Sequence, residues 1–287
     1  MARGWRQARP ADRVTLFPIS DGGDGFGVLV GASLGARTET IVTVNAAHLP
    51  CTANWWWEPN SRTAIIEAAQ ANGLARLPAG KHHPFDLDTF GLGAVIASAH
   101  AKGARHCLVG IGGSATNDGG FGVAHSLGWT FFGERGATIE RWTELHSLSR
   151  CQPPKIAGWP DEMLVAVDVQ NPLLGPTGSS RIYGPQKGLR EEDFDLAERC
   201  LGRLADVMES QSKPLQNPAL DRSAARPRIW LVCRAQRLAR PSGGSGLGGH
   251  WRRLNRPFHI HGQRCWRTGG VVPRSQKTVL GIGRRGE

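Results

Sequence analysis

Residues 112–120, with the sequence GGSATNDGG, are the segment of this chain best suited to bind an anion. Its glycines lack the Cβ atoms that would keep consecutive backbone N–H groups from converging on a phosphate oxygen. Ser114 and Thr116 add hydroxyl donors, and a helix beginning after the segment would add positive charge from its N-terminus. The carboxylate of Asp118 could hold Mg²⁺ directly or through water. The alternative is a tight turn that uses glycine for its positive φ and Asn117-Asp118 for its closure.

A second loop with this character is DGGDG, residues 21–25. Its two acids, Asp21 and Asp24, could bind a metal ion. They do not form an EF-hand, because that loop needs more ligands and a distal Glu. The alternative is a turn whose acids are solvated.

The third polar segment, residues 168–188, reads DVQNPLLGPTGSSRIYGPQKG. Asp168 follows a predicted strand, where burial could tune its pKa for work as a general base. Asn171 can bond to a substrate hydroxyl, and Lys187, next to Gln186, can neutralise phosphate charge. An isolated Asp or Lys is more often structural than catalytic, but three such segments in one chain favour phosphoryl transfer. Kinase chemistry is the preferred interpretation, since no nicotinamide-type GxGxxG stands in the required strand–helix setting. Residues 112–120 are not a Walker A motif, because no Gly-Lys-Ser/Thr follows them.

Alternating strands and helices are predicted to position these segments. Residues 106–111 form a short apolar strand that leads directly into residues 112–120. The repeated order of strand, loop and helix predicts the α/β class, in which ligands bind at the carboxyl ends of strands. Trp55-Trp56-Trp57 is predicted to lie in a strand or the core, with a stacking platform as the alternative. Further strands are predicted at residues 13–19, 37–44 and 163–169, and helices at 64–72, 89–102, 121–127 and 190–211.

Composition excludes several classes of protein. The chain has 287 residues, long enough for one large domain or two ordinary ones. No apolar run approaches the ~20 residues that span a bilayer, and the first residues lack the apolar region of a secretory signal. Its 6 cysteines are scattered without a CxxC pair, so we expect free thiols and not a zinc site. We therefore expect a cytoplasmic protein with no membrane partner.

The positive charge is concentrated in residues 226–287. The net charge is +11, yet this segment alone holds 14 Lys and Arg and one acid, Glu287. A basic, glycine-rich segment with three Trp residues could bind nucleic acid through phosphate charge and base stacking. The alternative, which we favour, is a poorly packed chain end, so we expect no nucleic-acid partner.

Four segments resemble the bacterial glycerate kinases, which use ATP to phosphorylate D-glycerate. They are residues 18–26 (PISDGGDGF), 63–74 (TAIIEAAQANGL), 110–122 (GIGGSATNDGGFG) and 168–188. The resemblance covers roughly residues 2–225 in order, and the last two segments are highly specific to that family. It implies a Rossmann-like α/β domain interrupted by a large inserted mixed α/β domain. In this chain we expect an incomplete Rossmann-like part at residues 1–39, the inserted domain at 40–212, and a basic tail at 213–287.

The resemblance also implies an active site in the cleft between the two domains. Asp168 would deprotonate a glycerate hydroxyl, Lys187 would stabilise the transferring phosphoryl group, and Asp118 would position Mg²⁺. The partners implied are D-glycerate and ATP. The other matching positions, which would bind substrate or nucleotide, are Asp21, Gly22, Gly23, Gly112, Gly113, Ser114, Thr116, Asn117, Asn171 and Gln186.

The sequence departs from the family at two places. Relatives usually begin with a further strand and a DSFKG-like loop, which we expect this chain to lack. After Ala225 relatives continue with a sequence like GGLGFGL, whereas this chain reads RPRIWLVC. Synonymous codons exist for residues 226–233 that, read one nucleotide later, encode GLGFGLC. We therefore expect a frameshift after Ala225 and impaired activity; the alternatives are a nucleic-acid-binding protein acting through residues 226–287 and a non-catalytic binder of nucleotide or sugar acid.

Overall fold

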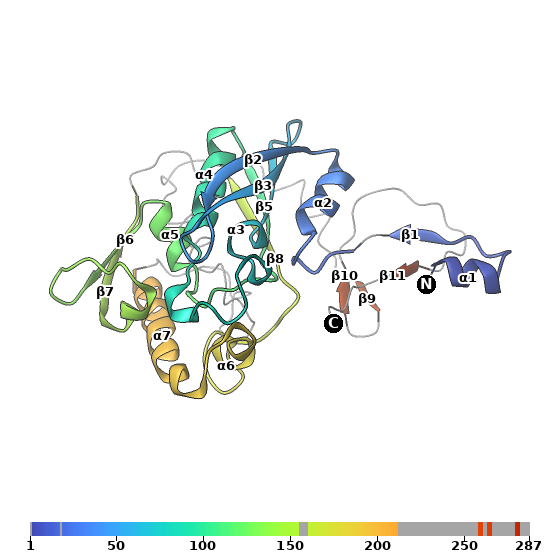
Figure 1. Ribbon diagram of the computed structural model, residues 1–287. Coiled ribbons are helices and arrows are strands. Elements are labelled where there is room, and N and C mark those ends of the chain that lie inside the picture. Colours follow the sequence, from blue (N-terminus) through green and yellow to red (C-terminus); the bar gives the residue numbers. More distant parts are fainter. Residues whose placement is uncertain are drawn as a thin grey trace. The chain divides into compact units, whose positions relative to one another are not determined.

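The computed structural model describes residues 2–17, 19–154 and 160–211 and the backbone of three later strands (Figure 1). The chain divides into two compact units. The first comprises Met1–Ser20 with Pro241–Glu287, and the second comprises Asp21–Arg240.

The first unit contains one helix, α1 (Ala2–Ala8), and short strands among its described residues. Strand β1 (Thr15–Phe17) pairs in parallel with β11 (Val279–Gly281). Strands β9 (Phe258–Ile260) and β10 (Gln263–Cys265) form a separate antiparallel pair.

The second unit is built on a mixed five-stranded sheet with the order β2-β3-β4-β5-β8. Strands β2, β3 and β4 are antiparallel neighbours, whereas β4, β5 and β8 run parallel. The carboxyl ends of these three parallel strands therefore lie at one edge of the sheet. The strands are β2 (Arg37–Val44), β3 (Pro50–Glu58), β4 (Thr63–Glu67), β5 (His106–Gly110) and β8 (Glu162–Ala166).

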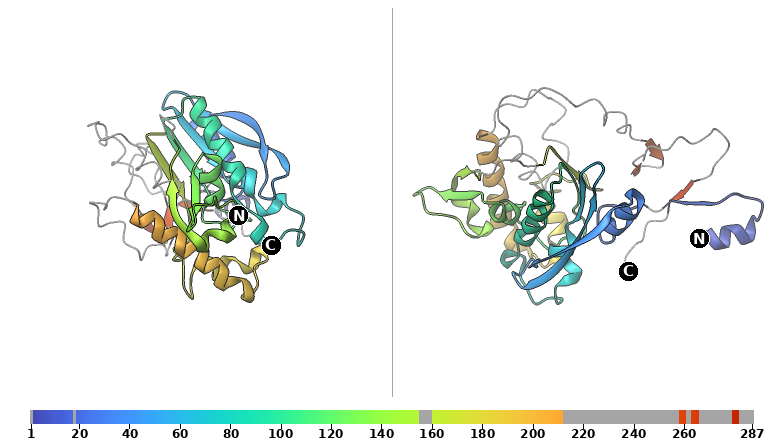
Figure 2. Two further views of the ribbon diagram at one scale, coloured as in Figure 1. Left: turned by 90° about the vertical axis from the view of Figure 1, so that its left-hand side faces the viewer. Right: turned by 90° about the horizontal axis from the view of Figure 1, so that it is seen from above.

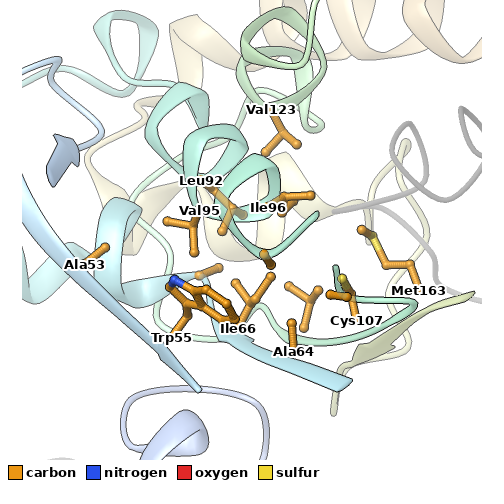
Figure 3. Packing of buried hydrophobic residues seen from close by; sticks show 14 of the residues in the cluster. Ala53, Trp55, Ala64, Ile66, Leu92, Val95, Ile96, Cys107, Val123 and Met163 are labelled. Atoms are coloured by element: carbon orange, nitrogen blue, oxygen red, sulfur yellow. The ribbon is translucent and has the colours of Figure 1, made fainter. Parts of the chain in front are cut away.

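Helices cover both faces of this sheet (Figure 2). Because side chains alternate along a strand, Trp55 and Trp57 of β3 pack on the face of α4 (Phe90–Ala101), and Trp56 packs on the face of α2 (Phe26–Leu34). Figure 3 shows the first cluster, in which the side chains of β3 and β4 meet those of α4. The three tryptophans are buried, which confirms core packing.

Two glycines explain how α2 reaches the sheet. A Cβ atom on Gly27 would lie 1.7 Å from Cζ3 of Trp56, and one on Gly31 would lie 2.7 Å from its Cδ1. The indole therefore packs against the bare backbone of the helix, and larger residues at these two positions would push α2 off the sheet.

A second core lies between a hairpin and the long amphipathic helix. Strands β6 (Thr130–Gly133) and β7 (Leu148–Gln152) are antiparallel, and α7 (Phe194–Ser210) packs on them and on α5 (Phe121–Ser126). Short helical elements complete the unit. They are α3 (Ala69–Asn72) and α6 (Ser179–Tyr183), with 3₁₀ turns at Leu74–Arg76, Pro84–Asp86, Trp142–Ser147, Pro185–Lys187 and Glu191–Asp193.

Most predicted elements are confirmed, and one is wrong. Residues 64–72, predicted as a helix, begin as strand β4, and the helix covers only Ala69–Asn72. The two β-branched residues Ile65 and Ile66 are fully buried and point to opposite faces of the sheet. Burial on both faces favours a strand at this position, and it outweighs the helix propensity of the alanines that follow.

The α/β class is confirmed by this mixed architecture. The expected domain boundary between residues 39 and 40 falls inside β2, and the division of residues 1–212 into an interrupted and an inserted domain stays a prediction. The expectation of a poorly packed segment at 226–287 falls, apart from the three short strands, on residues outside the described part of the chain. Within the described ranges, no helix is both long and apolar enough to cross a membrane.

Candidate active site

The first two glycine-rich segments meet at the carboxyl ends of β5 and β8. The amide of Gly112 donates a 2.9 Å hydrogen bond to the carbonyl oxygen of Gly22. A Cβ atom on Gly112 would lie 2.7 Å from the Cα of Gly23, and one on Gly22 would lie 2.7 Å from the carbonyl oxygen of Ala166. These glycines allow backbone to pack on backbone, so the geometry gives them a structural role; contact between them and phosphate stays a prediction.

The acids of the DGGDG loop lie close to a buried glutamate at the end of β4. Asp21 accepts a 2.9 Å hydrogen bond from the amide of Gly23, which closes the turn. Glu67 is buried and accepts hydrogen bonds from the amide of Gly27 at 2.9 Å and from Nε2 of Gln70 at 3.1 Å. Burial first, and then the charge of Glu67, raise the pKa of the Asp24 carboxyl. This corner of the site is therefore acidic.

A small pocket lies beside these loops, between the second and third segments. Its volume is about 40 Å³, and its walls come from the ends of β4 and β5, the start of α4, residues 114–120, α6 and α7. The polar lining residues are Asn72, Thr89, Ser114, Thr116, Asn117, Asp118, Ser179 and Lys187.

Two side-chain contacts join the second segment to the third across this pocket. Nζ of Lys187 donates a hydrogen bond to the carbonyl oxygen of Thr116, and Nδ2 of Asn117 donates a 3.0 Å hydrogen bond to Oγ of Ser180. Lys187 is only 7% exposed, although its residue type is almost never buried unless it is paired. The fold thus holds a cation at the pocket, where it would attract an anionic ligand.

Asp118 is held by the protein itself. Its Oδ2 accepts hydrogen bonds from the amide of Thr89 at 2.9 Å, from Oγ1 of Thr89 at 2.7 Å and from the amide of Gly122 at 2.9 Å. Its Oδ1 faces the amide of Gly120 at 3.3 Å. Burial first, and then the charge of Asp88, raise the pKa of this carboxyl. Both oxygens are engaged and the side chain is 1% exposed, so Asp118 does not fit the expected role of a magnesium ligand.

The part of the chain that the structure describes offers no alternative metal site. Among the described residues there is no group of three or more His, Cys, Asp or Glu side chains arranged to hold a metal ion. The buried carboxylate instead ties the start of α4 to the start of α5, which fixes the pocket wall between them.

The other predicted residues of the third segment lie outside the pocket lining. Asp168 follows β8 by two residues and is exposed, so the burial expected of it is absent. Asn171 donates a 3.0 Å hydrogen bond to the carbonyl oxygen of Thr177 and accepts one from the hydroxyl of Tyr183. Gln186 is exposed on the turn before Lys187. Asn171 therefore has a structural partner on each side of its amide.

Asn72, Thr89 and Ser179 line the pocket but were not among the predicted site residues. Thr89 had no signal of its own, because its role depends on a hydrogen bond to a residue 29 positions away. Asn72 did have one: it lies in the glycerate-kinase-like segment 63–74, in the position just before Gly73. Because residues 64–72 were predicted to form one helix, the position of Asn72 at the pocket was not apparent from the sequence.

The family model of the glycerate kinase family matches residues 1–225. This chain belongs to the glycerate kinase family. The match ends at Ala225, where the resemblance read from the sequence also ends.

Relatives in the family support the same assignment. The chain is 35% identical over 213 residues to a glycerate kinase of Bacillus subtilis (strain 168), covering 72% of this chain and 55% of that protein. It is also 35% identical over 213 residues to glycerate 2-kinase of Escherichia coli (strain K12), with the same shares covered. The chain thus spans about half the length of these relatives.

A solved structure resembles the fold as well. It is a crystal structure of a protein assigned as glycerate kinase 2 from Salmonella typhimurium LT2, with a TM-score of 0.66 and 29% sequence identity. The alignment covers 81% of this chain and 64% of that one. This member of the glycerate kinase family therefore resembles that solved structure in fold over most of its length.

Proposed function

We propose that this chain binds ATP and D-glycerate and transfers a phosphoryl group from the first to the second. The observation that carries the proposal is the buried ammonium group of Lys187, held at a small pocket between residues 114–120 and residues 179–187. The positive charge of Lys187 would attract an anionic ligand to this pocket. Family membership over residues 1–225 supplies the reaction class.

In the proposed reaction, a hydroxyl oxygen of glycerate forms a bond to the γ-phosphorus of ATP. The bond between that phosphorus and the β,γ-bridging oxygen breaks, and ADP leaves. The hydroxyl proton passes to a carboxylate, for which we propose Asp168, because it is exposed just beyond the carboxyl end of β8. The charge of Lys187 would orient the substrate and stabilise the negative charge that it carries.

Magnesium would neutralise the phosphates of ATP. We assign no residue to it, because the carboxylate expected to hold it, Asp118, is fully engaged in hydrogen bonds within the protein. The acidic corner formed by Asp24 and Glu67 lies on the same edge of the sheet, but it is not a built metal site. A reaction on ATP and a small organic acid would take place in the cytoplasm, which is the location we expect.

The proposal includes reduced turnover, since the family match ends at Ala225 and we expect residues 226–287 to be read out of frame. Binding and turnover are therefore measured separately on the intact chain. Calorimetry with D-glycerate and with ATP should show binding of each, and release of ADP should depend on D-glycerate. Binding of either compound alone, without any turnover, would indicate a non-catalytic binder.

Two variants test the assigned roles. Asp168→Asn should collapse turnover with little change in ATP binding, and retained turnover would reject the role of base. Lys187→Met should weaken D-glycerate binding at least tenfold, which is the effect expected when a buried charge-assisted contact is lost. The matched controls are Asp206→Asn on the exposed side of α7 and Lys81→Met, which is exposed and does not line the pocket.

A further inference from the structure

Arg76 carries an exposed positive charge that is held in place by neutral partners. It ends the 3₁₀ turn Leu74–Arg76, which follows α3. Its Nη1 donates a 3.2 Å hydrogen bond to the carbonyl oxygen of Thr52, and its Nη2 donates a 3.0 Å hydrogen bond to Oε1 of Gln70. Within the described part of the chain Arg76 forms no ion pair with a carboxylate. Its charge is therefore positioned but not neutralised by direct pairing.

A buried carboxylate fixes the side chain that orients Arg76. Nε2 of Gln70 donates a 3.1 Å hydrogen bond to Oε1 of Glu67, which is 3% exposed. Since the amide nitrogen of Gln70 is turned to Glu67, its oxygen is turned to Arg76. The two bonds that Arg76 makes leave the other N–H groups of its guanidinium fork for a ligand. A side chain that is already ordered loses less entropy when it binds.

The turn that carries Arg76 is fixed to the second glycine-rich segment. The amide of Leu74 donates a 2.8 Å hydrogen bond to the carbonyl oxygen of Gly113. The preceding residue, Gly73, forms an isolated β-bridge with Ser114. The guanidinium is thus attached, through a short turn, to the segment whose residue types suit an anion.

The DGGDG loop meets the same glycine. A Cβ atom on Gly113 would lie 3.1 Å from Oδ2 of Asp24. Burial first, and then the charge of Glu67, raise the pKa of the Asp24 carboxyl, and the positive charge of Arg76 opposes them. Arg76 therefore acts electrostatically at the acidic corner where residues 21–25 and 112–120 come together.

The location of Arg76 favours a polyphosphate as its ligand. The pocket beside Lys187 has a volume of about 40 Å³, and neither Gly113 nor Arg76 lines it. A single water-sized group needs about 10–15 Å³, so a triphosphate is too large for that pocket. Arg76 is exposed, so a ligand of any size can reach it from solvent. A guanidinium fork also matches two oxygens of one phosphate group, which a single ammonium group cannot do.

We propose that Arg76 binds a phosphate group of the triphosphate beside Gly113, outside the pocket that holds the charge of Lys187. This inference rests on the proposed function and adds to it a residue that holds the phosphoryl donor. The negative charge of Asp24 would repel the phosphates, and the positive charge of Arg76 offsets that repulsion. The small acid would then lie at Lys187 and the nucleotide on the open side of residues 112–114.

The test is calorimetry on the intact chain with ATP, inorganic tripolyphosphate and D-glycerate, at one fixed salt concentration. Arg76→Met removes the charge and the fork but keeps an unbranched side chain at an exposed position. We expect this variant to bind ATP and tripolyphosphate more weakly by the same factor, at least about tenfold, because the two ligands share the phosphate chain. Its affinity for D-glycerate should stay within about twofold of that of the unmodified chain.

Two further variants separate binding from structure. Arg76→Lys keeps the charge but not the fork, so it should recover only part of the affinity for ATP and tripolyphosphate. Arg105→Met is the matched control, since Arg105 is an exposed arginine that pairs with Asp161 just before the start of β5, at the opposite end of that strand from Gly112. It should leave all affinities unchanged. An equal loss of affinity for D-glycerate in Arg76→Met would show a structural role and overturn the inference.

The outcomes separate the two proposals. Unchanged binding of ATP and tripolyphosphate in Arg76→Met rejects the role of Arg76 and leaves the proposed function standing. Weaker binding of ATP with unchanged binding of tripolyphosphate also overturns the inference, because the contact is then not with phosphate. No binding of ATP to the unmodified chain rejects both proposals. Equal weakening of ATP and tripolyphosphate, with D-glycerate unaffected, supports the inference.

Discussion

The amide of Gly112 and the carbonyl oxygen of Gly22 are joined by a 2.9 Å hydrogen bond at the carboxyl ends of the parallel strands. This bond ties the DGGDG loop to the loop that follows β5, with glycine facing glycine. The two segments look in the sequence like two separate glycine-rich loops. In the structure they form one packed unit, and the pocket lies beside it.

We predict that Gly112→Ala destabilises the protein by about 1–3 kcal/mol, the usual effect of overpacking. The new Cβ atom would lie 2.7 Å from backbone atoms of Gly23, which cannot move aside as a flexible side chain could. Urea denaturation measures the free energy of unfolding. The control is Gly202→Ala within α7, where the nearest atom is a leucine methyl at 3.4 Å and helix propensity favours alanine by about 0.5–1 kcal/mol. Equal stability of Gly112→Ala and the unmodified chain would contradict the packing described here.

We predict that Asp118→Ala lowers the free energy of unfolding by about 3 kcal/mol. The substitution leaves the buried amides of Thr89 and Gly122 without an acceptor, and each such group costs about 1–3 kcal/mol. Asp206→Ala on the exposed surface of α7 should change stability by less than about 0.5 kcal/mol. A similarly small loss for Asp118→Ala would show that the carboxylate is not what fixes α4 to α5.

The contribution of Asp118 should also depend on pH. Burial raises the pKa of this carboxyl above its ordinary value of 3.8, so the folded state binds a proton more tightly than the unfolded state does. The part of its contribution that comes from binding this proton is then fully present below pH 3.8 and is lost as the pH rises through the raised pKa, whereas the hydrogen bonds that it accepts from Thr89 and Gly122 remain. Unfolding measured for the unmodified chain and Asp118→Ala from about pH 3 to about pH 7 should show the difference between them shrinking with pH. A difference that grows with pH would mean that the pKa is lowered instead.

The reading frame after Ala225 is a separate prediction. We expect the nucleotides that encode residues 226–233, read one position later, to give GLGFGLC or a closely similar sequence. The measurement is the nucleotide sequence of codons 224–234. Codons that give no glycine-rich sequence in the shifted frame would reject the frameshift. If the prediction holds, restoring the frame should increase glycerate-dependent release of ADP.

The sequence predicted the strands and loops of the site well, because apolar runs such as residues 106–110 and glycine-rich loops are local signals. It was less successful where a residue's role depends on distant partners. Asp118 looked like a metal ligand, since nothing in its neighbourhood shows that Thr89 would occupy its oxygens. Asn72 was not predicted as a site residue because residues 64–72 were predicted to form one helix. Ile65 and Ile66 instead lie in a strand, because β3 and β5 pair with it on its two sides. Burial and long-range hydrogen bonding, which no local pattern encodes, account for these differences.

The strands β4, β5 and β8 are neighbours in the sheet, although residues 68–105 and 111–161 separate them along the chain. The sheet and most of the pocket lining are therefore carried by different stretches of sequence. Mutations in the connecting stretches can reshape the pocket while the buried strands continue to hold the sheet together.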